Sequence, residues 1–197
     1  CGRASVMVRR RPLVAVLPTG TELIAPGSIP EKGDIIDFNS TMLSAMVSEC
    51  GGIAAKQGII NDDADLLRRT ILDSLAGSDL VLINAGSSAG REDFTSDVIA
   101  GLGQVIVHGV NIKPGKPVIL GIVQGKPVIG IPGYPVSAAL TFNLFVKPLL
   151  YAMQGRTDPP PETLTAKLSR QVASALGVEE FLRVKVGSVS GNLIATP

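Results

Sequence analysis

The sequence predicts an α/β fold in which a mostly parallel sheet is doubly wound into a three-layer α/β/α sandwich, followed by the start of a small β domain. Short apolar runs alternate with helix-like segments from residue 12 to residue 103. Most of these runs are nearly all apolar, which is typical of strands buried on both faces. Because crossover connections place helices on both faces of a parallel sheet, this order favours a doubly wound domain.

The first strand is predicted at Pro12–Gly20, where "PLVAVLPTG" is a short apolar run ended by Pro and Gly. The run Arg9–Arg11 before it is interpreted as solvated. "DFNSTMLSAMVSECGG" then predicts a helix of about three turns, with Asn39 or Ser40 as its cap and the glycine pair as its stop. Its buried stripe is expected to be Met42, Leu43, Met46 and Val47.

The second and third strands flank a second helix. "IAAKQGIIND" predicts a strand at residues 53–62, and "DLVLINAG" predicts a third, buried strand at residues 79–86. Between them, "DDADLLRRTILDSLAGS" predicts a helix that is capped by Asp62 or Asp63 and ends at Gly77. Its apolar residues at four-residue spacing are Leu67, Ile71 and Leu75.

The pattern changes from Gln104 onward. Two strand-like runs contain the letters GKPVI, at residues 115–119 and 125–129. A tight turn at Gln124-Gly125 joins them, which predicts a hairpin. "PVSAALTFNLFVKPLLYAMQG" then predicts a long apolar helix with Pro135 near its first turn and a kink or break at Pro148.

Composition divides the chain into three parts. Residues 1–11 are predicted to be a connecting segment, residues 12–155 an α/β domain, and residues 156–197 a linker with part of a β domain. "RTDPPPETL" has the composition of a linker, and the segment after it alternates like the start of an antiparallel sheet. Because the chain opens on Cys1 and stops inside the strand-like "GNLIATP", it is predicted to be a piece of a longer protein.

Composition also excludes several classes of function. Eighteen Lys and Arg against 17 Asp and Glu leave a net charge of +1, and Trp is absent, so nucleic acid is not an expected partner. Gly, Pro, Lys or Asn interrupts every apolar run before the roughly 18 residues that span a bilayer, so no membrane span is expected. Cys1, Cys50 and the single His108 can form neither a disulfide framework nor a tetrahedral zinc site, which favours a reducing, cytoplasmic setting.

The motif G-x-S-x-G at residues 86–90 has two interpretations. In a serine hydrolase Ser88 would be the nucleophile, but the base histidine normally lies far downstream, and here His108 follows after only 20 residues. A loop between a central parallel strand and a helix is instead where open α/β sheets bind ligands, and its N–H groups and hydroxyls can hold a phosphate. The candidate phosphate-binding residues are Gly86, Ser87, Ser88 and Gly90, and a tight turn without a ligand is the alternative.

Acidic residues follow the predicted strand ends. "TGTEL" places Glu22 after the first strand, "NDD" places Asp62 and Asp63 after the second, and "RED" places Glu92 and Asp93 after the third. Carboxylates gathered near a phosphate repel it, and Mg²⁺ would relieve this because it takes oxygen ligands and bridges to phosphate. Glu22, Asp62, Asp63, Glu92 and Asp93 are therefore the candidates for such a site. A helix cap is the alternative role for Asp62 or Asp63.

Two later segments offer anion-binding groups. "NIKPGKP" puts Lys113 and Lys116 three apart on a Pro-Gly turn, and "IPGYPVSA" begins a helix whose free N–H groups lie near Ser137. The alternatives are a solvated hairpin edge for the lysines and an ordinary first-turn hydroxyl for Ser137. Lys126 is interpreted as structural, and His108 as a packed or surface strand residue.

Five motifs, in this order and spacing, resemble the molybdopterin-binding domain of molybdopterin molybdenumtransferases, which is related to the gephyrin E domain. The motifs are "PTGTEL", "DDADLLRRTI", "NAGSSAGREDFT", "IKPGKP" and "PGYPVSAALTF". The likeness covers residues 12–155, and "EEFLRV" to "NLIATP" resembles the opening of that family's small C-terminal β-barrel. Adenylyltransferase and competence-damage domains share the fold, but the lysine turn, the "PGxPVSA" segment and the attached β domain favour the transferase.

The resemblance implies insertion of molybdate into adenylylated molybdopterin with release of AMP, assisted by Mg²⁺, in a homodimer. It implies that Glu22, Asp62 and Asp93 are active-site carboxylates and that Lys113 is functional, with Lys116 as the second candidate catalytic lysine. The carboxylates would hold Mg²⁺ at the pyrophosphate while the lysines attract molybdate, without a nucleophilic side chain. The candidate substrate-binding residues are Thr19, Gly20, Asp37, Asn39, Gly86, Ser87, Ser88, Gly90, Pro132, Gly133, Pro135 and Ser137.

Three positions depart from the family pattern. Ala85 stands where the loop usually begins with a glycine, Gly109 where a second lysine is often found, and Tyr134 where the family has Asn. These changes bear on substrate affinity. A non-catalytic module that binds or senses molybdopterin or the molybdenum cofactor is therefore the alternative function, ahead of an adenylyltransferase or a serine hydrolase.

Overall fold

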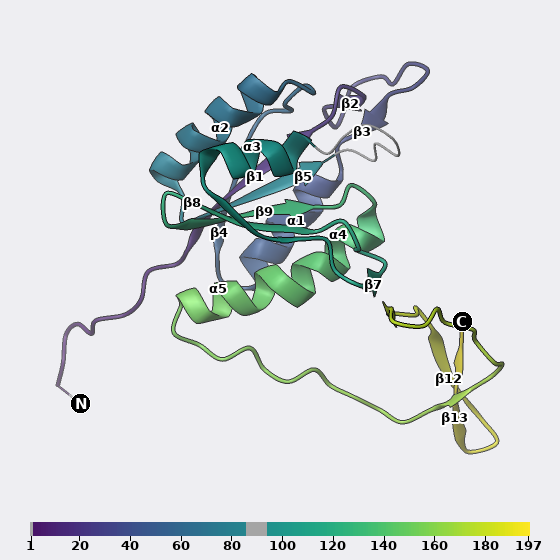
Figure 1. Ribbon diagram of the computed structural model, residues 1–197. Helices are drawn as coiled ribbons and strands as arrows, with labels where there is room; N and C mark the ends of the chain where they lie inside the picture. Colours follow the sequence, from purple (N-terminus) through teal and green to yellow (C-terminus); the bar gives the residue numbers. More distant parts are fainter. Residues whose placement is uncertain (1, 86–93) are drawn as a thin grey trace.

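The computed structural model describes residues 2–85 and 94–197. Its main sheet consists of β1 (Leu13–Thr19), β4 (Ile53–Lys56), β5 (Leu80–Ala85), β6 (Gln104–His108), β8 (Ile119–Val123) and β9 (Lys126–Ile131). The strand order is β4-β1-β5-β9-β8-β6, and Figure 1 shows the sheet among its helices. β4, β1, β5 and β9 are parallel, whereas β8 runs antiparallel to both β9 and β6. The predicted mostly parallel sheet is confirmed.

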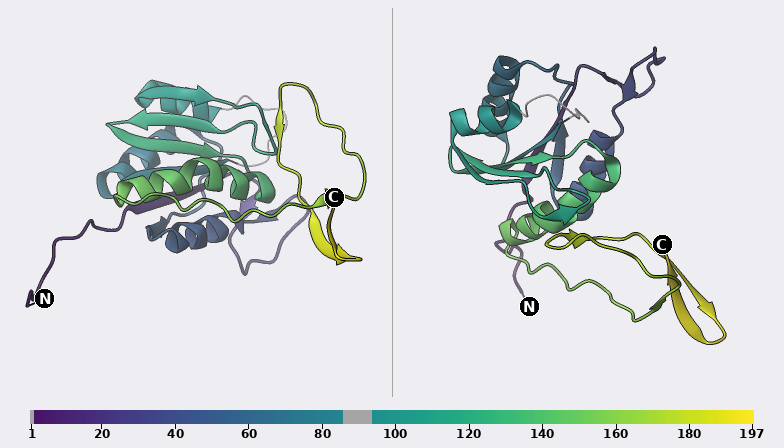
Figure 2. Two further views of the ribbon diagram at one scale, coloured as in Figure 1. Left: turned by 90° about the horizontal axis from the view of Figure 1, so that it is seen from below. Right: turned by 45° about the vertical axis from the view of Figure 1, so that its right-hand side comes forward.

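Helices cover both faces of this sheet, so the predicted α/β architecture is confirmed (Figures 1 and 2). One face packs against α1 (Asn39–Glu49) and against the run α4 (Pro135–Thr141), η1 (Phe142–Val146) and α5 (Lys147–Met153). The other face packs against α2 (Ala64–Gly77) and α3 (Phe94–Leu102).

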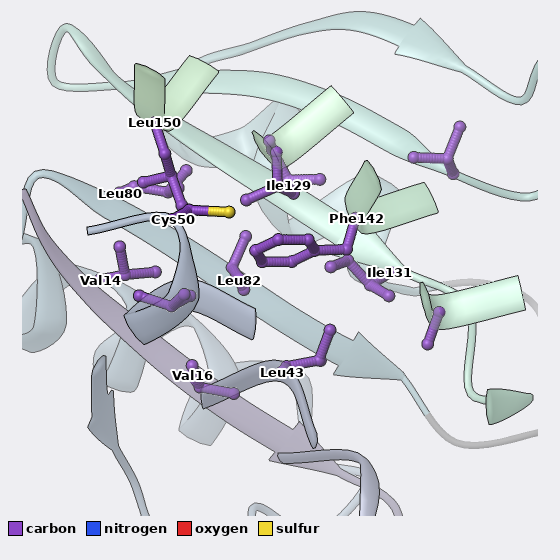
Figure 3. Close-up of a cluster of buried hydrophobic side chains, with 14 residues drawn as sticks. Val14, Val16, Leu43, Cys50, Leu80, Leu82, Ile129, Ile131, Phe142 and Leu150 are labelled. Atoms are coloured by element: carbon purple, nitrogen blue, oxygen red, sulfur yellow. The ribbon is translucent and has the colours of Figure 1, made fainter. Parts of the chain in front are cut away.

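Successive residues of β1 face opposite layers of the core. Val14 and Val16 belong to the cluster that contains Phe142, which Figure 3 shows between the sheet and the helices of one face. Ala15 and Leu17 belong to the cluster on the other face. All five side chains are fully buried, which explains why the first strand has no polar alternation.

The first two helices begin with aspartate side chains that bind backbone N–H groups. Asp37 Oδ1 accepts a hydrogen bond of 3.1 Å from Ser40 N at the start of α1. The predicted capping role of Asn39 or Ser40 is therefore wrong, because both residues already lie inside the helix. At α2 the cap is Asp63, whose Oδ1 accepts from Leu66 N at 2.8 Å. This leaves Asp62 free for another role.

The second strand is shorter than predicted. β4 ends at Lys56 instead of continuing to Asp62, and the pairing with β1 returns only as an isolated bridge between Thr19 and Ile60. Pro18 lies in β1 between these two stretches, and its carbonyl accepts from Ile60 N at 2.9 Å. Because proline has no N–H to donate toward the same neighbour, the ladder is interrupted there.

The long apolar helix continues through Pro148 with a change of winding. The residues before it, η1, form a π-helical turn between α4 and α5. Proline cannot donate a hydrogen bond to the carbonyl four residues earlier, and a wider turn accommodates that loss. The predicted kink or break is thus a local π turn.

This helical run also bears on the expectation that no segment spans a membrane. Pro135–Met153 covers 19 residues with a mean hydropathy of 1.4, which is long and apolar enough to cross a membrane by length and composition alone. Asn143, Lys147 and Pro148 interrupt the apolar run in the sequence, but the helix continues across them. Its Phe142, whose side chain is fully buried, packs in the core cluster against the sheet. These contacts are those of a helix that covers a sheet.

The predicted hairpin is present, with β8 and β9 joined at Gln124 and Gly125. Both residues have positive φ, 51° and 74°, as a two-residue hairpin turn requires. The first strand of the hairpin begins at Ile119 rather than at Gly115, because residues 114–117 belong to a separate turn.

The arginine run before β1 makes specific contacts, so its interpretation as merely solvated is wrong. Arg10 forms an ion pair with Asp79 at the start of β5, and its Nη1 lies 2.6 Å from Asp79 Oδ2. Arg11 Nε donates to the carbonyl of Gly51, after α1, at 2.9 Å. Lys126, which was expected to be structural, donates to the carbonyls of Leu75 and Ser78 at the end of α2.

The C-terminal part contributes a small sheet and one strand that pairs back with the main domain. β10 (Lys167–Leu168), β12 (Lys185–Val189) and β13 (Asn192–Thr196) form the small sheet in the order β10-β13-β12, which Figure 2 shows beside the α/β part. β11 (Glu179–Glu180) pairs in parallel with β7 (Ile112–Lys113). The remaining pair is β2 (Leu23–Ile24) with β3 (Ile35–Ile36).

Candidate functional site

The carboxyl ends of β1, β5 and β9 lie side by side at one edge of the main sheet. The register pairs Thr19 with Ala85 and Asn84 with Ile131, so the last residues of the three strands are level. β8 begins at the same edge because it is antiparallel to β9, and β6 ends there because it is antiparallel to β8. The segments that follow β1, β6 and β9 therefore share one rim of the sheet, the rim at which β5 also ends.

Twelve of the candidate residues lie in elements or connections at this rim. They are Thr19, Gly20, Glu22, Asp37, Asn39, Asp62, Lys113, Lys116, Pro132, Gly133, Pro135 and Ser137. The other five, Gly86, Ser87, Ser88, Gly90 and Asp93, lie outside the residues that the structure describes.

Two carboxylates contact the turn after β1. Asp62, from the segment before α2, accepts a hydrogen bond from Thr21, with Oδ2 and Oγ1 2.8 Å apart. Glu22 lies on the same turn, and its carboxylate folds over Gly20, where an added Cβ would stand 2.8 Å from Glu22 Oε2. Gly20 has a φ of +149°, so this turn requires glycine for its conformation as well as for space.

These two carboxylates fit a Mg²⁺ site that other ligands would complete. Within residues 2–85 and 94–197 there is no group of three or more His, Cys, Asp or Glu that could hold a metal. Mg²⁺ is commonly bound through one or two carboxylates, and water and substrate phosphates fill its other positions. Glu22 and Asp62 match that donor chemistry. The third predicted ligand, Asp93, belongs to the residues outside the description.

Asn84 joins the central strand ends, a role that sequence reasoning missed. Its side chain is 3% exposed, and Nδ2 donates to the carbonyl of Pro132 at 3.3 Å. Thr19 is also buried, and its hydroxyl donates to the carbonyl of Asn84 at 3.3 Å. Asn84 is the polar residue in the apolar run "LVLINA", and this exception to the pattern could have identified it from the sequence. The Thr19 hydroxyl therefore connects the ends of β1 and β5.

The Asp37 carboxylate is buried and already has partners within the protein. Asp37 is 2% exposed, accepts hydrogen bonds from the backbone and hydroxyl of Ser40, and forms an ion pair with Lys56 Nζ at 3.1 Å. A buried carboxylate with these partners anchors the start of α1 against β4. Lys56 was not among the sequence candidates, because nothing local indicates which carboxylate it reaches.

Asn39 connects α1 to the segment that leads into α4. Its Nδ2 donates to the carbonyl of Gly133, and its side chain is 7% exposed. Its Oδ1 is buried without a hydrogen-bond partner in the described part of the chain. An unpaired buried carbonyl is costly, so this oxygen is a position where a donor group of a ligand would be stabilising.

The start of α4 presents one exposed aromatic ring at the rim. Tyr134 precedes the helix and is 63% exposed, whereas Ser137 in the first turn is buried. Pro135 occupies the first helical position, where its missing N–H has no cost. The Ser137 hydroxyl is thus held within the first turn, next to the connection that carries Pro132 and Gly133.

The lysine turn, residues 111–117, extends beyond the β6–β8 pair at this rim. The backbone closes it, because Val110 N donates to Lys116 O at 2.9 Å. Residues 111–117 and Val178 line a cavity of about 270 Å³. Gly115 packs on α4, since a Cβ there would stand 3.0 Å from the Thr141 hydroxyl. Lys113 and Lys116 are both exposed.

A glutamate from the C-terminal part pairs with one of these lysines. Lys113 Nζ lies 3.1 Å from Glu180 Oε1, and the side chains are 69% and 19% exposed. The contact follows from strand pairing, because β11 lies against β7 with Glu180 opposite Lys113. Hydrogen bonds from Lys113 and then from Ser174 hold the pKa of the Glu180 carboxyl below its usual value.

The acidic turn and the lysine turn are separated along the rim. β1 and β8 are three positions apart in the sheet. Because neighbouring strands lie about 4.8 Å apart, the strand ends next to the two turns are about 14 Å apart. A single small ion cannot touch both, whereas an elongated ligand with one charged end at each turn can.

His108 is the residue that a serine hydrolase mechanism would need as its general base. His108, at the end of β6, has its Nδ1 3.2 Å from the hydroxyl of Ser96 in α3. The proposed nucleophile, Ser88, lies outside the described residues. The described part of the chain therefore pairs the single histidine with a different serine, as expected for a surface residue that packs against a neighbouring helix.

The sequence matches a family model described as "Probable molybdopterin binding domain" over residues 15–152. A molybdopterin molybdenumtransferase of Mycobacterium tuberculosis is 32% identical over 201 residues, which cover 98% of this chain and 49% of that protein. The chain thus spans about half the length of such relatives.

Solved structures show the same relationship. The crystal structure of the molybdopterin biosynthesis MoeA protein from Pyrococcus horikoshii has a TM-score of 0.82 at 39% identity, and the match covers 95% of this chain and 45% of that one. CinA from Thermoplasma acidophilum has a TM-score of 0.54 at 18% identity, covering 70% of this chain and 97% of that one. The second likeness shows a shared fold alone.

Proposed function

This chain belongs to the family of molybdopterin-binding domains found in molybdenum cofactor biosynthesis proteins, and from that premise we propose that it takes part in inserting molybdate into adenylylated molybdopterin with release of AMP. The observation that carries the proposal is the rim of the sheet. Its two carboxylates at one turn and its two lysines at another suit an elongated ligand with a phosphate-bearing end and an oxyanion end.

The acidic turn is the proposed phosphate end. Glu22 and Asp62 would hold Mg²⁺, which supplies positive charge between the carboxylates and the ligand phosphates. The hydrogen bond from Thr21 holds the Asp62 carboxylate in place at the turn. Ser87, Ser88, Gly86 and Gly90 are proposed to bind phosphate from the loop after β5, and Asp93 to complete the acidic group.

The lysine turn is the proposed oxyanion end. Lys113 and Lys116 would attract molybdate and offset the negative charge that develops as AMP leaves, which is electrostatic stabilisation and requires no nucleophilic side chain. Asn39 and the start of α4 lie between the two ends. The unpaired Asn39 Oδ1 supports a contact with a donor group of the pterin.

The test is calorimetry of this chain with molybdopterin, AMP and molybdate, each with and without Mg²⁺. We expect molybdopterin and AMP to bind more tightly with Mg²⁺, and the gain to be lost in Asp62→Ala. Asp73→Ala, which removes an exposed carboxylate from α2, is the matched control. Equal loss in both variants, or binding indifferent to Mg²⁺ and to Asp62, would refute the acidic turn as the phosphate end.

Turnover separates two proposals. For the transferase, Asp93→Asn should abolish AMP release while the fold is retained. The alternative is a module that binds or senses the cofactor without turnover. It is favoured by the pairing of Lys113 with Glu180 and by Tyr134 at the rim. Tight molybdopterin binding without AMP release from the adenylylated form, measured in the full-length protein, would identify the module.

The proposed setting is a homodimer in the cytoplasm. Relatives are about twice as long as this chain, so the whole protein's activity and partners require the complete chain. Sedimentation of the full-length protein would test the dimer, because a monomer at micromolar concentration would contradict it.

A further inference from the structure

The Glu180 carboxylate occupies the place on Lys113 where an incoming anion would bind. Nζ of Lys113 and Oε1 of Glu180 are 3.1 Å apart, and the lysine belongs to the turn that lines the cavity of about 270 Å³. Val178, two residues before Glu180, lines the same cavity. The C-terminal segment is thus part of the wall at this end of the rim.

Backbone pairing fixes the glutamate, whereas the lysine is free to turn. Glu179 N donates to Asn111 O, and Phe181 N donates to Lys113 O, each at 2.8 Å. These bonds set the register that puts Glu180 opposite Lys113. The Lys113 side chain is 69% exposed and that of Glu180 is 19% exposed. An anion that reaches Lys113 therefore meets a carboxylate whose backbone is held at this position.

We propose that Glu180 is a built-in competitor that weakens the binding of oxyanions at the lysine turn. Like charges a few ångströms apart repel, so a tetrahedral dianion on Lys113 must displace the ion pair or tolerate the nearby carboxylate. The consequence is selectivity, because this competition weakens the binding of a free anion more than that of a ligand held also at the acidic turn. This inference rests on the proposed function of the lysine turn.

The experiment measures the dissociation constant of sulfate, used as a tetrahedral dianion, from the backbone amide shifts of Asn111, Ile112, Lys113, Gly115 and Lys116 in this chain. Exposed ion pairs contribute little net free energy, so Glu180→Gln should tighten sulfate binding only by about two- to fivefold. Glu179→Gln removes the same charge from the neighbouring residue of the same strand and should have a smaller effect. In Lys113→Gln, the further change Glu180→Gln should have no effect.

Three results would overturn the inference: Glu180→Gln binds sulfate no better than the parent, Glu179→Gln tightens binding equally, or the effect persists without Lys113. Molybdopterin titration of the same variants separates this from the proposed function. If molybdopterin binds and Glu180→Gln leaves sulfate affinity unchanged, only the competition fails. If Glu180→Gln tightens sulfate and molybdopterin never binds, only the proposed function fails.

Discussion

Thr21 donates its hydroxyl hydrogen bond to Asp62 across the turn after β1, with Oγ1 and Oδ2 2.8 Å apart. The neighbouring Asp63 faces the other way and caps α2 through Leu66 N. Two adjacent aspartates thus have separate roles, one at the rim of the sheet and one at a helix end.

Asp62→Ala should remove Mg²⁺-dependent ligand binding and leave stability almost unchanged. The carboxylate is exposed, and exposed substitutions of this kind usually change the free energy of unfolding by less than about 0.5 kcal/mol. Calorimetry with AMP and Mg²⁺ checks the first part, and urea unfolding checks the second. Unchanged affinity would remove Asp62 from the proposed site.

Asp63→Ala should lower stability and spare binding. Loss of an N-cap acceptor costs about 1 kcal/mol, because the first-turn N–H groups of the helix lose their partner. Asp63→Asn is the control, since asparagine caps helices about as well as aspartate. Urea unfolding of the three proteins gives the comparison, and equal stability of Asp63→Ala and the parent would contradict the cap.

Gly20→Ala should displace the Glu22 carboxylate and weaken Mg²⁺-dependent binding. The new methyl group would stand 2.8 Å from Glu22 Oε2, so that side chain must move. Gly27→Ala is a suitable control because Gly27 also has a positive φ, +92°, with open space around it. Both variants should lose stability through backbone strain, but only Gly20→Ala should lose affinity in the calorimetric titration.

Asn84→Ala should destabilise the protein by about 1–2 kcal/mol, because it leaves the carbonyl of Pro132 buried without its donor. The ends of β5 and β9 would also be joined less firmly. Urea unfolding measures the loss. Asn61→Ala, at an exposed position, is the control and should be neutral. Equal behaviour of the two variants would show that the Asn84 amide contributes nothing measurable.

Asp79→Asn should remove a part of the stability that depends on pH. The hydrogen bond from Arg10, first, and that from Leu13 N hold the pKa of Asp79 below its ordinary value of 3.8. A carboxyl with a lowered pKa in the folded state stabilises the protein above its ordinary pKa, and this contribution is lost as pH falls through the lowered value.

The difference in unfolding free energy between the parent and Asp79→Asn should therefore be constant above about pH 5 and shrink toward about pH 2. Urea unfolding at a series of pH values checks this. A difference that persists unchanged in acid would show that the ion pair is not its source.

Local chemistry in the sequence determined the fold class and much of the element order. The apolar runs of β1 and β5, the four-residue spacing of α2 and the Gln124-Gly125 turn were each predicted, because each depends on residues within one element. The motifs also placed the candidate residues at strand ends, and parallel strands bring such ends to one rim. The family resemblance was likewise carried by short motifs.

Only the tertiary structure decided which groups meet. It assigned Asp62 to Thr21 and Asp63 to the helix, paired Asp37 with Lys56, and placed Glu180 on Lys113 across 67 residues of chain. These contacts join elements that are distant in sequence. Each carboxylate could pair with any of several basic residues of the chain. Strand order, register and burial select one partner among them, and no local pattern contains that information.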